Sequence, residues 1–169
     1  ETRHVIQEVG FDGAVSTRWG RWNRPGREAG HLFNPKWVHE TPGRDLLVAD
    51  GHNHRCLLLG ADGAERVIAP ADRSLSVPTF IAEAGDGTYR ICDAGLRCLF
   101  ELDAAGSVIR QLGKAVARTR DFSFPRSVEV TGPGRYLIAD TANNRVVEWD
   151  QGRLRPWTME PGTGLSWPR

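Results

Sequence analysis

The stretch that decides the fold is residues 125–157, PRSVEVTGPGRYLIADTANNRVVEWDQGRLRPW. It holds four short runs of β-branched and aromatic residues with nearly alternating polarity, at 127–130, 136–139, 145–149 and 154–157. Residues that tolerate turn geometry separate these runs, at 132–134, 141–144 and 150–152. The pattern predicts four short β-strands joined by tight turns.

The same pattern occurs twice more, with a constant spacing. A proline precedes an aspartate by fifteen residues in three places, at Pro35 and Asp50, Pro78 and Asp93, and Pro125 and Asp140. The prolines are 43, 47 and 43 residues apart, and the last step ends at Pro168. Each aspartate ends an apolar run and is followed by a polar turn and an arginine, namely Arg55, Arg97 or Arg145. A spacing kept in three copies predicts a repeat protein.

The repeat resembles the NHL repeat, whose pattern is roughly P-x-x-V, a strand ending in V-A-D, then N-x-R-V and a D-x-x-G turn. The copy P-R-S-V … L-I-A-D-T-A-N-N-R-V-V-E-W-D-Q-G matches best, and P-K-W-V … L-V-A-D-G-H-N-H-R-C matches nearly as well. The middle copy departs at its turn, where Ala94-Gly95-Leu96 replaces the asparagine. The resemblance covers essentially the whole chain and implies a β-propeller with one four-stranded blade per repeat. Four short strands per forty-odd residues independently favour such blades.

The repeats predict an all-β fold in a single propeller domain. Blades one, two and three are expected at 35–69, 78–112 and 125–158, the outer half of a blade at 1–20, and the start of a further blade at 165–169. Three full blades with partial ones do not close a ring. The sequence therefore predicts part of a six-bladed ring, with seven blades as the alternative. The remaining blades are expected from a longer parent chain or from another chain.

Composition excludes several classes of protein. The 169 residues are 40% hydrophobic with a formal net charge of +1, and no apolar run is long enough to cross a membrane. The balanced charge argues against a dedicated nucleic-acid binder. Three cysteines, an odd number, do not predict a disulfide framework. No initiator methionine or signal peptide is recognisable, which predicts a processed chain or a fragment, and nothing assigns a cellular compartment.

One face of the propeller is the candidate ligand-binding surface. The loops between the second and third strands of each blade are expected on the same face as the crossings between blades, and the resemblance implies that NHL propellers often bind ligands there. This face collects basic, aromatic and amide side chains: Arg21, Trp22, Arg24, Arg27, His31, His52, His54, Lys114, Arg118, Arg120 and Asn143. A solvated loop surface without a ligand is the alternative interpretation.

The conspicuous charged residues of the repeat are interpreted as structural, because a group that every blade requires serves the blade. This applies to Asp50, Asp93, Asp140, Arg55, Arg97 and Arg145. Each aspartate is expected to accept hydrogen bonds from turn N–H groups, and each arginine to bridge neighbouring blades. Asn53 and Asn143 are expected at turn positions with positive φ.

The cysteines and histidines have equally plain interpretations. Cys92 occupies the small slot of Ala49 and Ala139, while Cys56 and Cys98 are aligned with Val146, so inert buried thiols are expected. A disulfide between Cys92 and Cys98 stays open as an alternative. His52 and His54 form an H-x-H pair without an evident third ligand, so no metal site is predicted.

The sequence favours a binding or scaffold module without catalytic residues or a cofactor. It has no H-E-x-x-H, G-x-S-x-G, glycine-rich phosphate loop or CxxC pair. The expected partner is a protein or small molecule on the loop face. The resemblance also implies an alternative, a propeller enzyme of the lyase or lactonase type with a metal near the central axis. RNA binding through the basic crossings is the second alternative, which the balanced charge disfavours.

Overall fold

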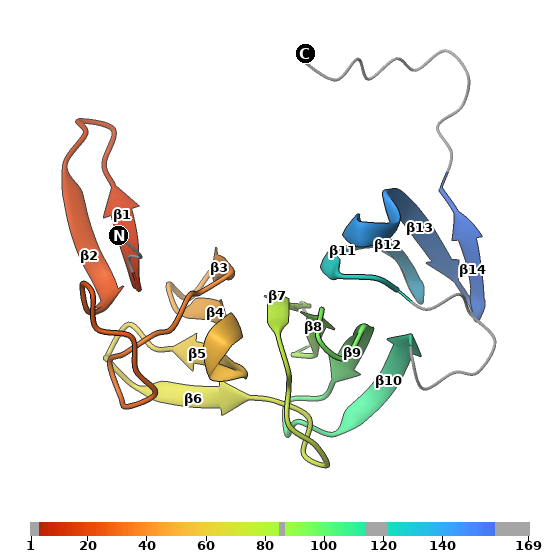
Figure 1. Cartoon of the computed structure of the whole chain (residues 1–169), viewed down its shortest axis with the longest axis horizontal. Coiled ribbons are helices and arrows are strands. Elements are labelled where there is room, and N and C mark those ends of the chain that lie inside the picture. Colours follow the sequence, from red (N-terminus) through yellow and green to blue (C-terminus); the bar gives the residue numbers. More distant parts are fainter. Residues whose placement is uncertain (1–3, 85–86, 114–121, 158–169) are drawn as a thin grey trace.

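The computed structural model describes residues 4–84, 87–113 and 122–157, and this part of the chain is built from antiparallel β-sheets (Figure 1). A two-stranded hairpin comes first, formed by β1 (Val5–Val9) and β2 (Val15–Gly20). Three four-stranded sheets follow it. The helical segments of the described residues are two three-residue 3-10 turns, η1 (Gly51–Asn53) and η2 (Thr141–Asn143). The predicted all-β fold with four-stranded antiparallel sheets is confirmed.

Each four-stranded sheet is a simple meander, and we call the three sheets blades one, two and three. Blade one comprises β3 (Trp37–Glu40), β4 (Leu46–Asp50), β5 (Arg55–Leu59) and β6 (Glu65–Ile68). Blade two comprises β7 (Pro78–Glu83), β8 (Tyr89–Asp93), β9 (Cys98–Leu102) and β10 (Val108–Gly113). Blade three comprises β11 (Pro125–Gly132), β12 (Arg135–Asp140), β13 (Arg145–Asp150) and β14 (Arg153–Pro156).

The blades stand side by side along an arc (Figure 1). The first strands, β3, β7 and β11, lie on its concave side, and the last strands, β6, β10 and β14, lie on its convex side. Strand β7 contacts both β3 and β11. The concave side is therefore built from the three inner strands, as in a propeller whose blades surround a central axis.

The hydrophobic core lies between blades, so both faces of a blade are apolar. Leu47 and Ala49 of blade one pack with Ile91 and Phe100 of blade two. On its opposite face, blade two packs against blade three through a second cluster, formed by Phe80, Cys92, Leu99, Leu112, Phe122, Val128, Tyr136, Ile138 and Val147. Because successive side chains of a strand point to opposite faces, β8 and β9 supply both clusters and are buried at every position.

The turn after each repeat aspartate corrects two predictions. Positive φ occurs at His54 (58°) and Asn144 (50°), one residue after the asparagines at which it was expected. In blade two the same position is Arg97 (57°), and the residue opposite Asp93 in the ladder is Cys98. Arg97 is therefore wrongly aligned with Arg55 and Arg145, which lie opposite their aspartates. Cys98 fills the arginine position instead.

The three cysteines are free and buried. Cys98 belongs to the cluster between blades one and two, and Cys92 to the cluster between blades two and three. The two thiols thus face opposite sides of blade two, and the alternative of a disulfide between them is wrong. Burial, together with the charge of Asp93, raises the pKa of Cys98 to about 12, so this thiol stays protonated at neutral pH.

Among the described residues, no helix has the length and apolar character needed to span a membrane.

Candidate functional site

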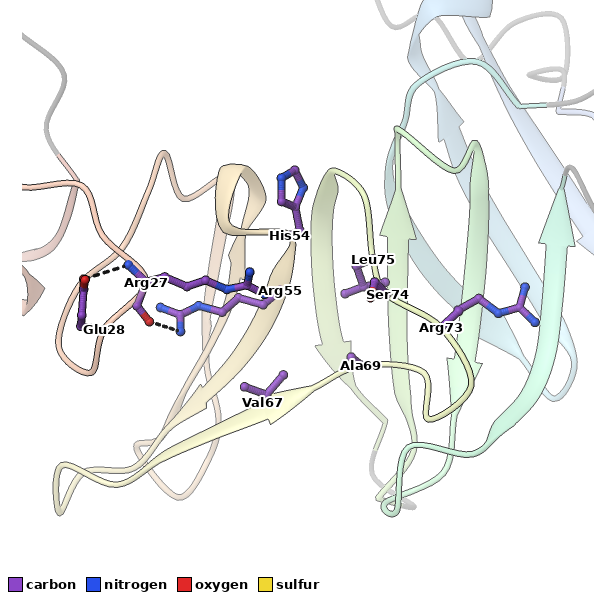
Figure 2. Close-up of a pocket in the computed structure, with 9 residues that line it drawn as sticks. All are labelled: Arg27, Glu28, His54, Arg55, Val67, Ala69, Arg73, Ser74 and Leu75. Atoms are coloured by element: carbon purple, nitrogen blue, oxygen red, sulfur yellow. Dashed lines mark hydrogen bonds between the residues drawn. The ribbon is translucent and has the colours of Figure 1, made fainter.

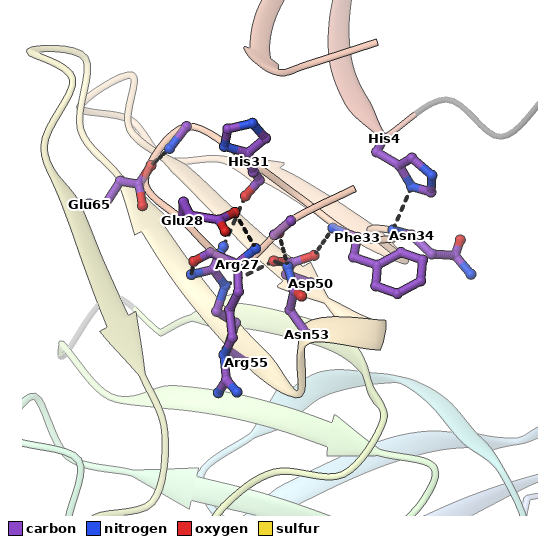
Figure 3. A network of polar contacts seen from close by, with 12 residues as sticks. His4, Arg27, Glu28, His31, Phe33, Asn34, Asp50, Asn53, Arg55 and Glu65 are labelled. Carbon is purple, nitrogen blue, oxygen red and sulfur yellow. Dashed lines mark hydrogen bonds and ion pairs between the residues drawn. The ribbon is translucent and has the colours of Figure 1, made fainter. Parts of the chain in front are cut away.

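The repeat aspartates clasp each crossing to the turn beside it. Asp50 is fully buried and accepts hydrogen bonds from the backbone N–H of Phe33 (2.7 Å), from Asn53 Nδ2 (2.8 Å) and from Arg55 Nε (2.9 Å) (Figure 3). The N–H of Phe33 belongs to the crossing between the hairpin and blade one. The aspartate thus satisfies groups of the crossing and of the turn with one side chain.

The other two aspartates repeat this arrangement with one change. Asp140 accepts from the N–H of Ser123 (2.6 Å), from Asn143 Nδ2 (2.8 Å) and from Arg145 Nε (2.7 Å). Asp93 has no arginine opposite it and accepts three backbone N–H groups instead, from Ser76 (2.7 Å), Val77 (3.0 Å) and Leu96 (2.9 Å). In each blade, the repeat aspartate thus accepts its hydrogen bonds from groups of the propeller scaffold itself.

The arginines hold crossings rather than face a ligand. Arg55 donates through its two terminal nitrogens to the carbonyl oxygens of Arg27 and His31, both at 2.9 Å. Arg97, despite its different position, donates from Nε to the carbonyl of Phe122 (2.8 Å) in the crossing to blade three.

Among the described residues, the predicted loop-face side chains do not converge on one site. Arg27 and His54 line a cavity of about 750 Å³ between blade one and residues 69–75 (Figure 2). Two basic side chains of this cavity already have partners. Arg55 donates to the carbonyl of Arg27 in the crossing, and Arg73 points away from the cavity and forms an ion pair with Asp72 at 2.6 Å. His54 Nδ1 contacts the carbonyl of Ser76.

The remaining candidates that the structure describes are dispersed. Arg21, Trp22 and Arg24 lie exposed on the first crossing. His31 presents its carbonyl to Arg55, and His52 Nε2 lies 3.2 Å from Asn34 Nδ2. Asn143 donates from Nδ2 to the carboxylate of Asp140. Lys114, Arg118 and Arg120 lie outside the described residues.

The H-x-H pair has two different partners. His52 lies beside Asn34 in the crossing that precedes blade one, and His54 beside Ser76 in the crossing that follows it. Within residues 4–84, 87–113 and 122–157, no three His, Cys, Asp or Glu side chains are grouped so that they could hold a metal ion.

A group of side chains that do lie together is found on the concave side. Its members stand at fixed positions after the repeat prolines. The first residue after each proline is Lys36, Thr79 or Arg126; the second is Trp37, Phe80 or Ser127; the fourth is His39, Ala82 or Glu129. All nine side chains line two cavities, of about 500 and 550 Å³, which share Trp37 and Ser127. We call these two joined cavities the axial groove.

Local strand geometry explains why Thr79 and Arg126 face the groove. The ladder between β7 and β8 pairs Pro78 with Asp93 and then Phe80 with Cys92, so Thr79 is an extra, bulged residue. The ladder between β11 and β12 skips Arg126 in the same way. A bulge redirects the side chain of the extra residue, as it often does beside binding sites.

The loop-face end of the axial groove is cationic and aromatic. Arg126 lies over the ring of Phe124, with its guanidinium carbon 5.5 Å from the ring centroid. The stem of Lys36 crosses Gly51, where an added Cβ would lie 2.8 Å from Lys36 Cγ. In the described part of the chain neither cation has a carboxylate within ion-pair distance. Deeper in the groove, the rings of Trp37 and Phe80 pack 4.9 Å apart.

The axial groove borders a buried polar network between blades two and three. Arg90 donates to Glu101 Oε1 (3.1 Å), and the hydroxyl of Tyr136 donates to Glu101 Oε2 (2.9 Å). Burial and the charge of Glu101 raise the pKa of Tyr136. Arg90 lines the groove, is only 9% exposed and leaves its Nε without a hydrogen-bond partner.

The charged loops of the sequence indicate the loop face and do not reveal the axial groove. Its signal is nevertheless present in the sequence, as basic, aromatic and acidic residues at constant offsets from Pro35, Pro78 and Pro125.

Comparison with solved structures shows the propeller fold. The chain is similar to virginiamycin B lyase from Staphylococcus aureus, with a TM-score of 0.64 and 10% identity over 93% of this chain and 49% of that one. A catalytically inactive histidine-to-alanine variant of that lyase, with quinupristin, matches with a TM-score of 0.63 and 11% identity, over 94% of this chain and 50% of that one. A streptogramin B lyase matches with a TM-score of 0.63 and 15% identity, over 91% of this chain and 47% of that one.

The chain thus spans about half the length of the solved structures that it matches. At this level of identity the similarity establishes the fold alone. No protein-family model and no curated protein sequence matches the chain.

Proposed function

We propose that this protein is a ligand-binding propeller module of the NHL type, whose axial groove binds an anionic ligand that also carries an apolar or aromatic group. The observation that carries this proposal is the pair of exposed cations, Lys36 and Arg126, without carboxylate partners beside Trp37 and Phe124. Elsewhere in the fold, basic side chains of the repeat are bound to carboxylates or carbonyls.

The chemistry of the groove favours a carboxylate or a similar anion. An arginine guanidinium offers paired N–H donors that match a carboxylate, and a lysine ammonium adds a point charge. The hydroxyls of Ser127 and Thr141 line the same end and can donate to the same group. The aromatic rings provide apolar surface for the rest of the ligand.

The first test compares 2-naphthoate with its neutral amide, 2-naphthamide, by isothermal titration calorimetry. We expect the carboxylate to bind at least tenfold more tightly than the amide. Arg126→Gln and Lys36→Gln should each weaken 2-naphthoate binding by about tenfold, which corresponds to about 1.4 kcal/mol. Arg153→Gln is the matched control, because Arg153 is an exposed arginine on the outermost strand of blade three, outside the groove.

Equal affinity for the two probes, or equal loss in the control variant, would refute the proposal. The two alternatives have separate readouts. Stoichiometric metal in the purified protein would favour an enzyme of the lyase or lactonase type. RNA binding that weakens steeply with salt would favour an interaction through the basic crossings.

We also propose that a further blade, from the parent chain or from another chain, covers blade three within a six-bladed ring. Ala139 and Val146 occupy the positions of Cys92 and Leu99, which are fully buried by the next blade, yet Val146 is 38% exposed. An uncovered apolar sheet face favours association.

This proposal predicts concentration-dependent association of the 18.7 kDa chain in light scattering. Val146→Lys should reduce association, because it places a charge on the uncovered face. Val67→Lys, at a 57% exposed position on outer strand β6, should leave it unchanged. A chain that remains monomeric at every concentration would contradict the proposal.

A further inference from the structure

The far end of the axial groove is acidic. Glu83 on β7 and Glu129 on β11 line the cavity of about 550 Å³, and both are exposed. Neither forms an ion pair with any described residue. The contrast with Glu40 is informative, because Glu40 occupies the repeat position of Glu83 and pairs with Arg18 at 3.1 Å and Arg44 at 3.3 Å.

The other titratable groups at this end leave the two carboxylates uncompensated. Arg90 lines the same cavity, but its charge is neutralised by an ion pair with Glu101 at 3.1 Å. His39 lines the opposite wall, on β3. The acidic end therefore carries a net negative charge, and a protonated amine is the complementary ligand group.

An orphaned donor in the same cavity indicates a second polar group of the ligand. Arg90 Nε is buried and has no acceptor in the described part of the chain. A buried N–H without an acceptor destabilises the fold, because the group has lost its water and gained no partner. A ligand carbonyl oxygen between the acidic and cationic ends is the group that could supply the missing acceptor, after a small shift of the side chain.

The spacing of the two charged ends sets the length of the ligand. Arg126 and Glu129 are three residues apart on β11, which corresponds to about 10 Å along a strand. A fully extended peptide spans about 3.3–3.6 Å per residue, so three residues cover about the same distance. Trp37 and Phe80, between the two ends, provide an apolar wall for the central side chain.

We infer that the ligand of the axial groove is a short linear peptide of about three residues with both termini free. Its carboxylate binds Lys36 and Arg126, its apolar central side chain packs on Trp37 and Phe80, and its amine binds Glu83 and Glu129. This inference rests on the proposed function and adds to it the amine, the peptide backbone and the length.

The test is a titration with four synthetic peptides: Ala-Phe-Ala, its N-acetylated form, its C-terminal amide and the pentapeptide Ala-Ala-Phe-Ala-Ala. Ala-Phe-Ala is expected to bind at least tenfold more tightly than the N-acetylated form. This advantage should vanish in a variant carrying both Glu83→Gln and Glu129→Gln. Glu8→Gln is the matched control, since Glu8 is an exposed glutamate on the hairpin with only a 3.8 Å contact to Arg18.

The outcomes separate this inference from the proposed function. If the N-acetylated and free peptides bind equally, or the pentapeptide binds as well as the tripeptide, the inference is overturned while a preference for 2-naphthoate over 2-naphthamide still supports the proposed function. If the C-terminal amide binds as well as Ala-Phe-Ala, the carboxylate assignment is overturned. If no peptide binds at millimolar concentration, the peptide inference is overturned, and 2-naphthoate alone decides the proposed function.

Discussion

Asp50→Ala is expected to lower the free energy of unfolding by about 3–5 kcal/mol, because it leaves a buried cation without its counter-ion. The Arg55 side chain is 9% exposed and the Asp50 side chain is fully buried. Removal of the carboxylate also leaves the N–H of Phe33 without its acceptor and removes one of the two acceptors of Asn53 Nδ2, which keeps the carbonyl of Gly26. Urea unfolding followed by tryptophan fluorescence measures the loss.

The other two repeat aspartates are matched comparisons for this prediction. Asp93→Ala should cost less, about 1–3 kcal/mol, because among the described residues Asp93 binds only backbone N–H groups and leaves no buried cation behind. Asp140→Ala should also cost about 1–3 kcal/mol, because Arg145 is 26% exposed and water can solvate its guanidinium. If all three variants lost equal stability, the buried charge at Arg55 would not be the cause.

Glu101→Ala is expected to be about as destabilising, by about 3–5 kcal/mol, because it removes the only carboxylate paired with Arg90 among the described residues. The hydroxyl of Tyr136 also loses its acceptor. Since this network lies between blades two and three, its loss should weaken their packing. Chemical unfolding measures the effect, and the same curves report whether the two blades still unfold together.

Replacement of both charges by leucine is the control for this second prediction. Blade one carries Leu47 and Leu58 at the positions of Arg90 and Glu101, and both pack against blade two. The variant with Arg90→Leu and Glu101→Leu should therefore recover most of the stability lost in Glu101→Ala. A buried ion pair replaced by apolar residues of similar size is often neutral or stabilising. A double variant as unstable as the single one would contradict this account.

The strands and their grouping into blades were predictable because they depend on local chemistry repeated along the chain. The proline-to-aspartate spacing and the alternation of apolar residues predicted three four-stranded sheets, and these formed. The alignment of Arg97 was wrong because the sequence shows spacing but not ladder register. Only the pairing of Asp93 with Cys98 reveals that blade two has lost its buried arginine and satisfies its aspartate with backbone donors.

The sequence by itself determined the repeat, the strand order within each blade and the aspartate that ends each second strand. The tertiary structure decided which side chains meet. Lys36, Phe80 and Glu129 belong to three different repeats, and they share the axial groove only because β3, β7 and β11 lie together on the concave side. The network of Arg90, Glu101 and Tyr136 likewise depends on two adjacent blades. Contacts between residues tens of positions apart arise from packing, which local sequence patterns do not specify.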